Sequence, residues 1–171
     1  MTLLELQQVF PDASAETWHQ HTNGRGWVEN TATIEPTVYI GPNAWVYGNA
    51  WVYGDARVYG NAWVYGNARV YGNAWVYGNA WVYDDARVYG NAWEKSPLQI
   101  QGTRHFLNAC AYTEIAIGCH QQTIAWWLKH YQAVGRKEGY SPDEIEEYGT
   151  YIRLFAQRYS TNSTTPAAIA I

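Results

Sequence analysis

Four side chains that could carry chemistry lie in one part of the chain, at His105, Cys110, Cys119 and His120. A histidine beside a thiol can act as the general base for a nucleophile, and both residue types are common zinc ligands. Their spacing lacks the paired Cys-x-x-Cys of many structural zinc sites. The simpler interpretation is that Cys119 and His120 begin a helix under a strand. We therefore predict no catalytic residue, no metal and no cofactor.

Two further pairs of polar residues could contact a cation. His19 and His21 are two residues apart and would share one face of an extended segment, although two surface histidines are the simpler interpretation. Asp84 and Asp85 form an acidic pair. Two carboxylates are too few for a calcium site, and an aspartate tolerates the left-handed backbone of a turn, so a structural role is favoured there.

The elements that must position these residues are organised by a repeat. Residues 44–93 consist of the unit Ala-(Trp/Arg)-Val-Tyr-Gly-(Asn/Asp), present eight times and followed by Ala-Trp, with Asp84 in place of one glycine. Ala and Val point to one side of an extended chain, and the larger side chains point to the other. Gly-Asn supplies a corner. Because no unit reverses the chain, the pattern predicts a three-sided parallel β-solenoid with eighteen residues per coil and about four to five coils.

The same six-residue spacing extends beyond the perfect repeat. Steps back from Val46 reach Ile40, Ile34 and Val28, so the inward column is predicted to hold these three residues and the eight repeat valines. Glu94 falls at a valine position, and we expect the solenoid to span residues 26–97, ending at this charge and the following proline. Residues 98–120 keep strand-like runs and predict a degraded coil or a small strand cap.

Side chains eighteen residues apart are predicted to stack in columns on the outside of the solenoid. One face carries only aromatic residues, namely Trp27, Trp45, Trp63 and Trp81 with Tyr47, Tyr65 and Tyr83 beside them. The second face combines Trp51, Arg69 and Arg87 with a tyrosine column, and the third combines Arg57, Trp75 and Trp93 with another. Asparagine and aspartate side chains at the corners are expected to hydrogen-bond along the stack.

The flanks are predicted to be helical. Residues 1–25 form an N-terminal cap with a helix over residues 2–10, and residues 121–160 form two helices. The first of these spans residues 122–134 and the second begins at the Ser141-Pro-Asp-Glu144 capping signal, with a turn over residues 135–139 between them. Residues 161–171 read as a flexible tail.

The alanine–valine spacing resembles that of hexapeptide-repeat proteins with a left-handed parallel β-helix, and the resemblance covers about half of the chain. It implies the hand of the coil, and it raises the possibility of acyl transfer and of a trimer. The run Ile117-Gly-Cys-His-Gln-Gln-Thr-Ile-Ala-Trp-Trp also resembles the tail of phage- and prophage-encoded Tyr-Gly-Asn-Ala repeat proteins. It departs from them after Cys119. That second resemblance implies an accessory or interaction protein without an enzymatic activity.

The amino-acid composition favours some kinds of binding partner and argues against others. The 10 Trp and 15 Tyr against 3 Phe favour half-wet aromatic surfaces. Scattered basic residues and a net charge of -4 argue against binding to a nucleic-acid polymer. No stretch has the length of a membrane span, and the first residues do not resemble a signal peptide, so a cytoplasmic location is expected.

Three classes of function remain. Acyl transfer needs a general base, yet residues 26–97 contain no histidine or cysteine. A binding protein could stack a sugar or nucleotide signal on the aromatic faces, with Arg57, Arg69 or Arg87 for phosphate, or could capture a host factor. The favoured class is a self-assembling scaffold whose tryptophan face is covered by another subunit, a trimer being preferred, or by the helix carrying Ile124, Trp127 and Leu128. The alternative is that this face stays exposed.

Overall fold

The structure, a computed structural model, describes residues 2–159; the predicted tail at 161–171 lies outside this range. The described chain divides into two compact units, one ending at Gln99 and one beginning at Ile100. None of the helices within residues 2–159 has both the length and the apolar character needed to cross a membrane.

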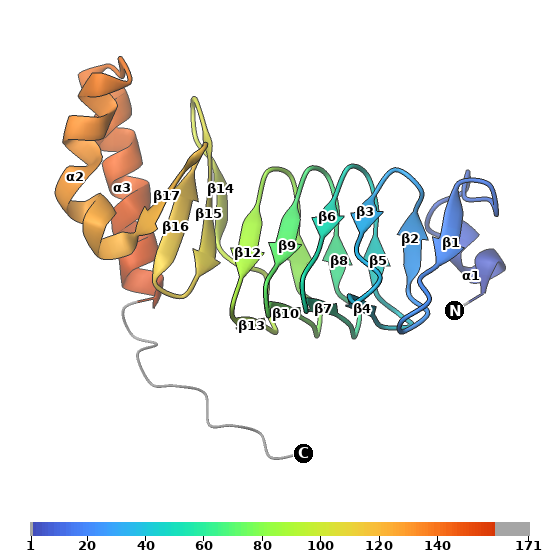
Figure 1. The fold of residues 1–171 in the computed structure, drawn as a ribbon. Coiled ribbons are helices and arrows are strands. Elements are labelled where there is room, and N and C mark those ends of the chain that lie inside the picture. The colour runs from blue at the N-terminus through green and yellow to red at the C-terminus, as the bar shows by residue number, and fades with distance from the viewer. Residues whose placement is uncertain (1, 160–171) are drawn as a thin grey trace. The chain divides into compact units, whose positions relative to one another are not determined.

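The first unit is a solenoid of four coils, each with three short strands (Figure 1). Strands of successive coils pair in parallel and build three sheets. The first sheet contains β2 (Trp27–Glu29), β5 (Trp45–Val46), β8 (Trp63–Val64) and β11 (Trp81–Val82). The second contains β3 (Thr33–Ile34), β6 (Trp51–Val52), β9 (Arg69–Tyr71) and β12 (Arg87–Tyr89). The third contains β4 (Tyr39–Ile40), β7 (Arg57–Val58), β10 (Trp75–Val76) and β13 (Ala92–Trp93). The predicted three-sided parallel β-solenoid is confirmed.

The core of the solenoid consists of the valine and alanine columns. The eight repeat valines, the eight alanines two positions before them, Val28 and Ile40 are fully buried. Each buried valine contributes about 1.5 kcal/mol. Ile34 is only half-buried, contrary to the prediction. Its strand β3 is the end strand of the second sheet. In the same coil, β2 pairs with β1, and the backbone of Ile40 in the end strand β4 bonds to Asn23 and Gly26.

The corners depend on backbone that favours glycine. Gly48 has φ +69°, and a Cβ there would lie 3.1 Å from the backbone nitrogen of Gly66 in the next coil. Asp84 takes the same left-handed conformation with φ 51°, as predicted. The expected amide ladders are present: Asn61 Nδ2 donates to Asn79 Oδ1 at 3.2 Å, and Asn67 Nδ2 donates to Asp85 Oδ1 at 3.1 Å.

Two glutamate side chains of the first coil accept hydrogen bonds from backbone N–H groups of the second coil. Glu29 and Glu35 stand where later units have tyrosine. Their carboxylates accept the backbone N–H groups of Gly48 and Gly54, each at 2.7 Å. These bonds join the first coil to the second at two corners.

Side chains also satisfy the last strand of the first sheet. The Gln99 side chain accepts the N–H of Tyr83 at 3.1 Å and donates to the carbonyl of Trp81 at 3.1 Å. Ser96 Oγ accepts the N–H of Trp81 at 2.9 Å. An amide side chain thus makes the two bonds that a further strand would make, and β11 does not present these groups as an open edge.

The end of the repeat differs from the prediction by one residue. Trp93, expected on the outside, pairs with Val76 and is buried, with 3% of its surface exposed. Glu94, expected at the inward position, is exposed. The slip turns an indole into the core and keeps the carboxylate in water, which avoids the cost of burying a charge.

The N-terminal segment contains a shorter helix than predicted and an additional strand. Helix α1 (Leu3–Gln7) begins with a capping box between Thr2 and Glu5. Strand β1 (Trp18–Gln20) then pairs antiparallel with β2 and so covers the first sheet at this end. No strand was predicted in residues 1–25.

The second unit pairs an antiparallel sheet with two helices (Figure 1). Its elements are β14 (Gln99–Gln101), β15 (Phe106–Ala111), β16 (Glu114–Ile117), β17 (His120–Thr123), α2 (Ile124–Lys137) and α3 (Pro142–Tyr159). The strand-like runs were predicted, but they form a meander instead of a degraded coil. His120 begins β17 and not a helix, because the helix starts only after the N-cap Thr123.

Close approach of the two helices explains a second difference. Gly135, assigned to a turn from the sequence, lies inside α2, where a Cβ would meet Ile145 Cγ1 at 2.7 Å. A Cβ at Gly149 of α3 would meet Tyr131 Cε2 at 2.5 Å. Each helix therefore has a glycine where the other packs against it. Gly139, with φ +71°, follows the end of α2.

Candidate functional site

The predicted tryptophan column forms as expected. Trp27 pairs with Trp45, Trp45 with Trp63, and Trp63 with Trp81 in the parallel register of the first sheet. The ring centroids of Trp45 and Trp63 are 4.6 Å apart, and those of Trp63 and Trp81 are 5.1 Å apart. The eighteen-residue coil therefore places these indoles in van der Waals contact.

The N-terminal segment covers the first half of this column. Trp27 and Trp45 are 7% and 6% exposed, in a cluster with Leu6, Ala13 and Trp18. Phe10 contacts Trp45 with ring centroids 5.3 Å apart. Trp63 is partly buried and Trp81 is 44% exposed. The N-terminal segment, which was not predicted as a cover, therefore shields the first two indoles. Trp127, on the helix proposed as a cover, instead donates Nε1–H to Ile115 O at 3.2 Å in its own unit.

The tyrosine column beside it is also stacked. Tyr47 and Tyr65 are parallel within 1° at a centroid distance of 4.9 Å, and Tyr83 follows at 5.5 Å from Tyr65. Burial, with smaller contributions from Tyr65 and Glu29, raises the pKa of Tyr47 to about 12. Burial also raises the pKa of Tyr65. Both hydroxyls therefore remain protonated donors at neutral pH.

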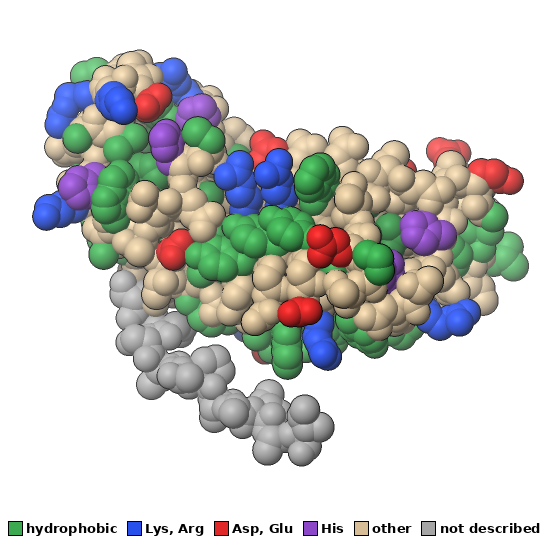
Figure 2. Space-filling view, viewed as in Figure 1, with side chains coloured by type: hydrophobic (Ala, Val, Ile, Leu, Met, Phe, Trp, Pro, Cys, Tyr) green, Lys and Arg blue, Asp and Glu red, His purple; other side chains and the backbone are tan. Residues whose placement is uncertain are grey.

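The other two faces combine tryptophan with arginine. The Arg69 guanidinium lies 5.5 Å from the ring centroid of Trp51, and Arg57 lies 5.5 Å from that of Trp75. Arg87 is in register with Arg69. Figure 2 shows hydrophobic side chains gathered over β9 and β12, with basic side chains next to them. A cation over an indole contributes about 0.5–1 kcal/mol at an exposed site, so these tryptophans already have a partner in the same chain.

The N-terminal histidines do not form a shared site. His19 Nδ1 lies 2.7 Å from Asn30 Oδ1. His21, expected at the surface, is only 6% exposed, and its Nδ1 lies 3.2 Å from the carbonyl of Asn23. Within residues 2–159 no group of three or more His, Cys, Asp or Glu side chains is arranged to hold a metal ion.

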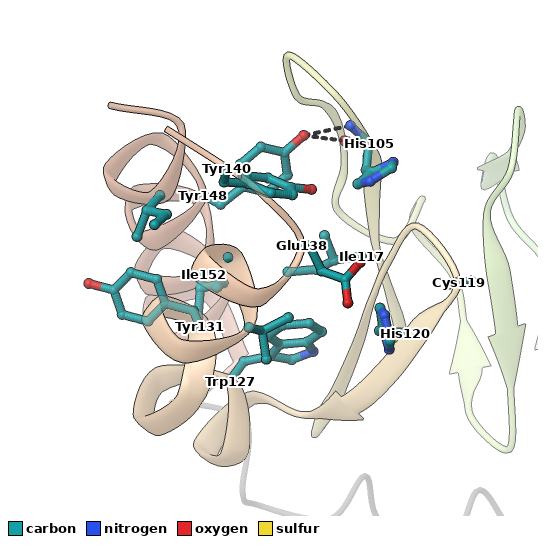
Figure 3. A pocket seen from close by; sticks show the side chains of 13 residues that line it. His105, Ile117, Cys119, His120, Trp127, Tyr131, Glu138, Tyr140, Tyr148 and Ile152 are labelled. Carbon is teal, nitrogen blue, oxygen red and sulfur yellow. Dashed lines mark hydrogen bonds between the residues drawn. The ribbon is translucent and has the colours of Figure 1, made fainter. Parts of the chain in front are cut away.

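The four chemistry-bearing residues of the second unit separate into two environments. Cys110 is fully buried in β15. His105, Cys119 and His120 are exposed and line a pocket of about 220 Å³, together with Glu138 (Figure 3). Burial, with a smaller contribution from Tyr148, raises the pKa of Tyr140 in the same lining to about 12.

Sequence reasoning missed several residues that shape these sites. Phe10 and Trp18 had the aromatic character needed to cover the tryptophan column, but a strand at 18–20 was not expected. Glu138 was assigned to a turn, although it is the C-cap residue of α2. The sequence carries no signal that the Tyr148 hydroxyl would bind a loop more than forty residues earlier in the chain.

The comparisons with known proteins concern the solenoid alone. Residues 50–66, 62–78, 68–83 and 80–95 match the family model of the YdcK beta solenoid repeat. The matched residues cover less than half of the chain and support a repeat β-helix protein. Neither the curated proteins nor the solved structures contain a match.

Proposed function

We propose that the protein is a non-enzymatic scaffold that binds a second copy of itself through the uncovered half of the tryptophan column. The observation that carries this proposal is the rise in exposure along the column, from 6% at Trp45 through the partly buried Trp63 to 44% at Trp81. With Trp63, Tyr65 and Tyr83, Trp81 forms what we call the open aromatic patch. Trp81 is exposed and the other three side chains are partly exposed. Because a fully buried aromatic side chain covers about 150–250 Å², the four together leave aromatic surface for a partner.

The chemistry of the open aromatic patch suits a second copy. The four side chains carry no formal charge, and their hydroxyl and indole groups can hydrogen-bond across an interface. The N-terminal segment adds two exposed apolar side chains, Leu4 at 76% and Val9 at 46%. Val9 precedes Phe10, whose ring centroid is 6.4 Å from that of Trp63. A closed assembly, with a trimer preferred, would bury identical patches by rotational symmetry.

The test compares two equally exposed tryptophans. Trp81→Arg should lower the molar mass in light scattering, because it adds a charge to the patch. Trp75→Arg is the matched control, since Trp75 is 43% exposed and lies beside Arg57 on another face. Circular dichroism must show that both variants are folded. A wild-type monomer at high concentration, or equal effects of the two variants, would exclude self-association through this patch.

The non-enzymatic part of the proposal has its own support and test. The solenoid residues 26–97 contain no histidine or cysteine to act as a base or nucleophile. We expect no saturable binding of acyl-CoA in calorimetry. Turnover of an acyl-CoA donor that is lost in His105→Ala or His120→Ala would overturn this expectation. A phage or prophage setting is also proposed, and it rests on the resemblance of residues 117–127.

A further inference from the structure

One wall of the pocket in the second unit is apolar, although two of its four residues carry a polar group. Ile117, Trp127, Tyr148 and Ile152 are each less than a tenth exposed. The polar atoms of the two aromatic residues are used elsewhere. Trp127 Nε1 donates to the carbonyl of Ile115, and the Tyr148 hydroxyl binds the backbone of residues 104 and 105. A ligand in the pocket therefore meets ring faces and aliphatic groups on this side.

The volume limits the size of the ligand. A cavity of about 150 Å³ lined by aliphatic and aromatic side chains can hold benzene. At about 220 Å³ the pocket has room for one ring with a short side chain. The close helix packing at Gly135, where a Cβ would meet Ile145, fixes the position of this wall.

The mouth of the pocket carries a negative charge. Glu138, His105 and His120 are exposed lining residues, and Figure 3 shows the Glu138 carboxylate and the His120 ring turned toward the space between sheet and helices. No lysine or arginine belongs to the lining. The nearby Arg104 stacks on Tyr140 at 4.3 Å and donates to the carbonyl of Gly139 at 3.1 Å. Glu138 is the one carboxylate among the lining residues.

We propose that this pocket binds a small aromatic amine, with its ring against Trp127 and Ile117 and its ammonium group at the carboxylate of Glu138. The imidazoles of His105 and His120 supply acceptors or donors for a second polar group on the ligand. This inference goes beyond the proposed scaffold function and does not depend on self-association. An apolar body fixed by a few polar groups at the rim is the usual form of a small-molecule site.

The test uses three probes that share a phenyl ring and differ in charge. These are 2-phenylethylamine, the neutral 2-phenylethanol and the anionic 3-phenylpropionate, each titrated into the full chain by calorimetry at neutral pH. For a ligand of this size we expect the amine to bind one site with a Kd on the order of 1 mM or tighter. The alcohol should bind more weakly, and the acid most weakly, because the Glu138 carboxylate repels it.

Three variants locate the binding. Glu138→Gln should weaken amine binding roughly tenfold and leave alcohol binding unchanged, because only a charge-assisted bond is removed. Val134→Trp, which enlarges a half-buried lining residue, should weaken both probes. Asp143→Asn, an exposed carboxylate of the same unit outside the lining, is the matched control. Circular dichroism checks the fold of each variant. Equal affinity for amine and acid, an unchanged amine Kd in Glu138→Gln, or no saturation by the amine at tenfold higher concentration overturns the proposal.

Discussion

The hydroxyl of Tyr148 holds the backbone of His105 from both sides. It accepts the His105 N–H at 2.6 Å and donates to the His105 carbonyl at 3.1 Å, and it also accepts the N–H of Arg104 at 2.9 Å. Helix α3 thereby fixes the loop between β14 and β15. The same loop binds Glu147 through the N–H of Thr103 at 2.9 Å.

Removing this hydroxyl should loosen the loop. Tyr148→Phe leaves two backbone N–H groups without their acceptor, and each such loss costs about 1–3 kcal/mol when water cannot replace it. We expect faster hydrogen exchange at residues 104–105. The control is Tyr151→Phe, whose hydroxyl lies at the surface beside Glu147. Equal exchange in the two variants would show that the Tyr148 bonds contribute nothing to the loop.

The inward and outward columns of the solenoid predict opposite tolerance to substitution. Val64 is fully buried, so Val64→Asp should unfold the first unit, and Val64→Ala should lower its free energy of unfolding by about 2 kcal/mol. Tyr65→Ser, one residue later and facing outward, should remain folded. Thermal unfolding followed by circular dichroism distinguishes these outcomes. Similar melting temperatures for Val64→Asp and Tyr65→Ser would contradict the burial pattern.

The two bonds of the Gln99 amide can be tested with a pair of variants. Gln99→Leu removes both bonds to β11, at Tyr83 N–H and Trp81 C=O, and should cost about 1–3 kcal/mol in total. Gln99→Glu keeps the acceptor for the Tyr83 N–H but sets a carboxylate oxygen against the Trp81 carbonyl oxygen, so it should destabilise at least as much as Gln99→Leu. Urea unfolding measures both. Exposing this strand edge should also raise concentration-dependent association of the leucine variant in light scattering.

Tyrosine titration gives a prediction about pH. Tyr47 and Tyr140 have pKa values raised from 10.0 to about 12, chiefly by burial. Because the folded pKa exceeds the unfolded one, the stability linked to each hydroxyl is fully present below pH 10 and is lost as the pH rises through 12. The ultraviolet absorbance of tyrosinate should therefore show a late step. Tyr47→Phe and Tyr140→Phe should each reduce it, and an unchanged late step in both would contradict these assignments.

The periodic part of the fold could be predicted because the residues of each six-residue unit determine the local structure of that unit. Alternation sets which side chains face inward, and a corner residue that tolerates positive φ follows each strand. Stacking of Trp45 on Trp63 and of Tyr47 on Tyr65 then follows from the coil length alone. Asp84, which replaces a corner glycine, also has a positive φ.

Prediction failed where the period ended. Extending the frame placed Glu94 inside and Trp93 outside, but the cost of burying a carboxylate outweighs the frame and shifts the register by one residue. The strand β17 has the polar sequence His-Gln-Gln-Thr, which carries no alternation of apolar residues. The pocket could not be derived because it depends on tertiary contacts, such as the close packing of Gly135 on Ile145.

Side chains bond to the backbone at both ends of the solenoid, and these bonds limit which insertions and deletions the solenoid can accommodate. Glu29 and Glu35 meet two corners of the second coil, and Gln99 meets the last strand of the first sheet. Adding or removing eighteen residues preserves both matches and changes the height by one strand spacing, about 4.8 Å. A gain or loss of six residues would keep every valine inside and every corner intact. It would nevertheless rotate the end of the chain by a third of a turn and bring Gln99 against a different side.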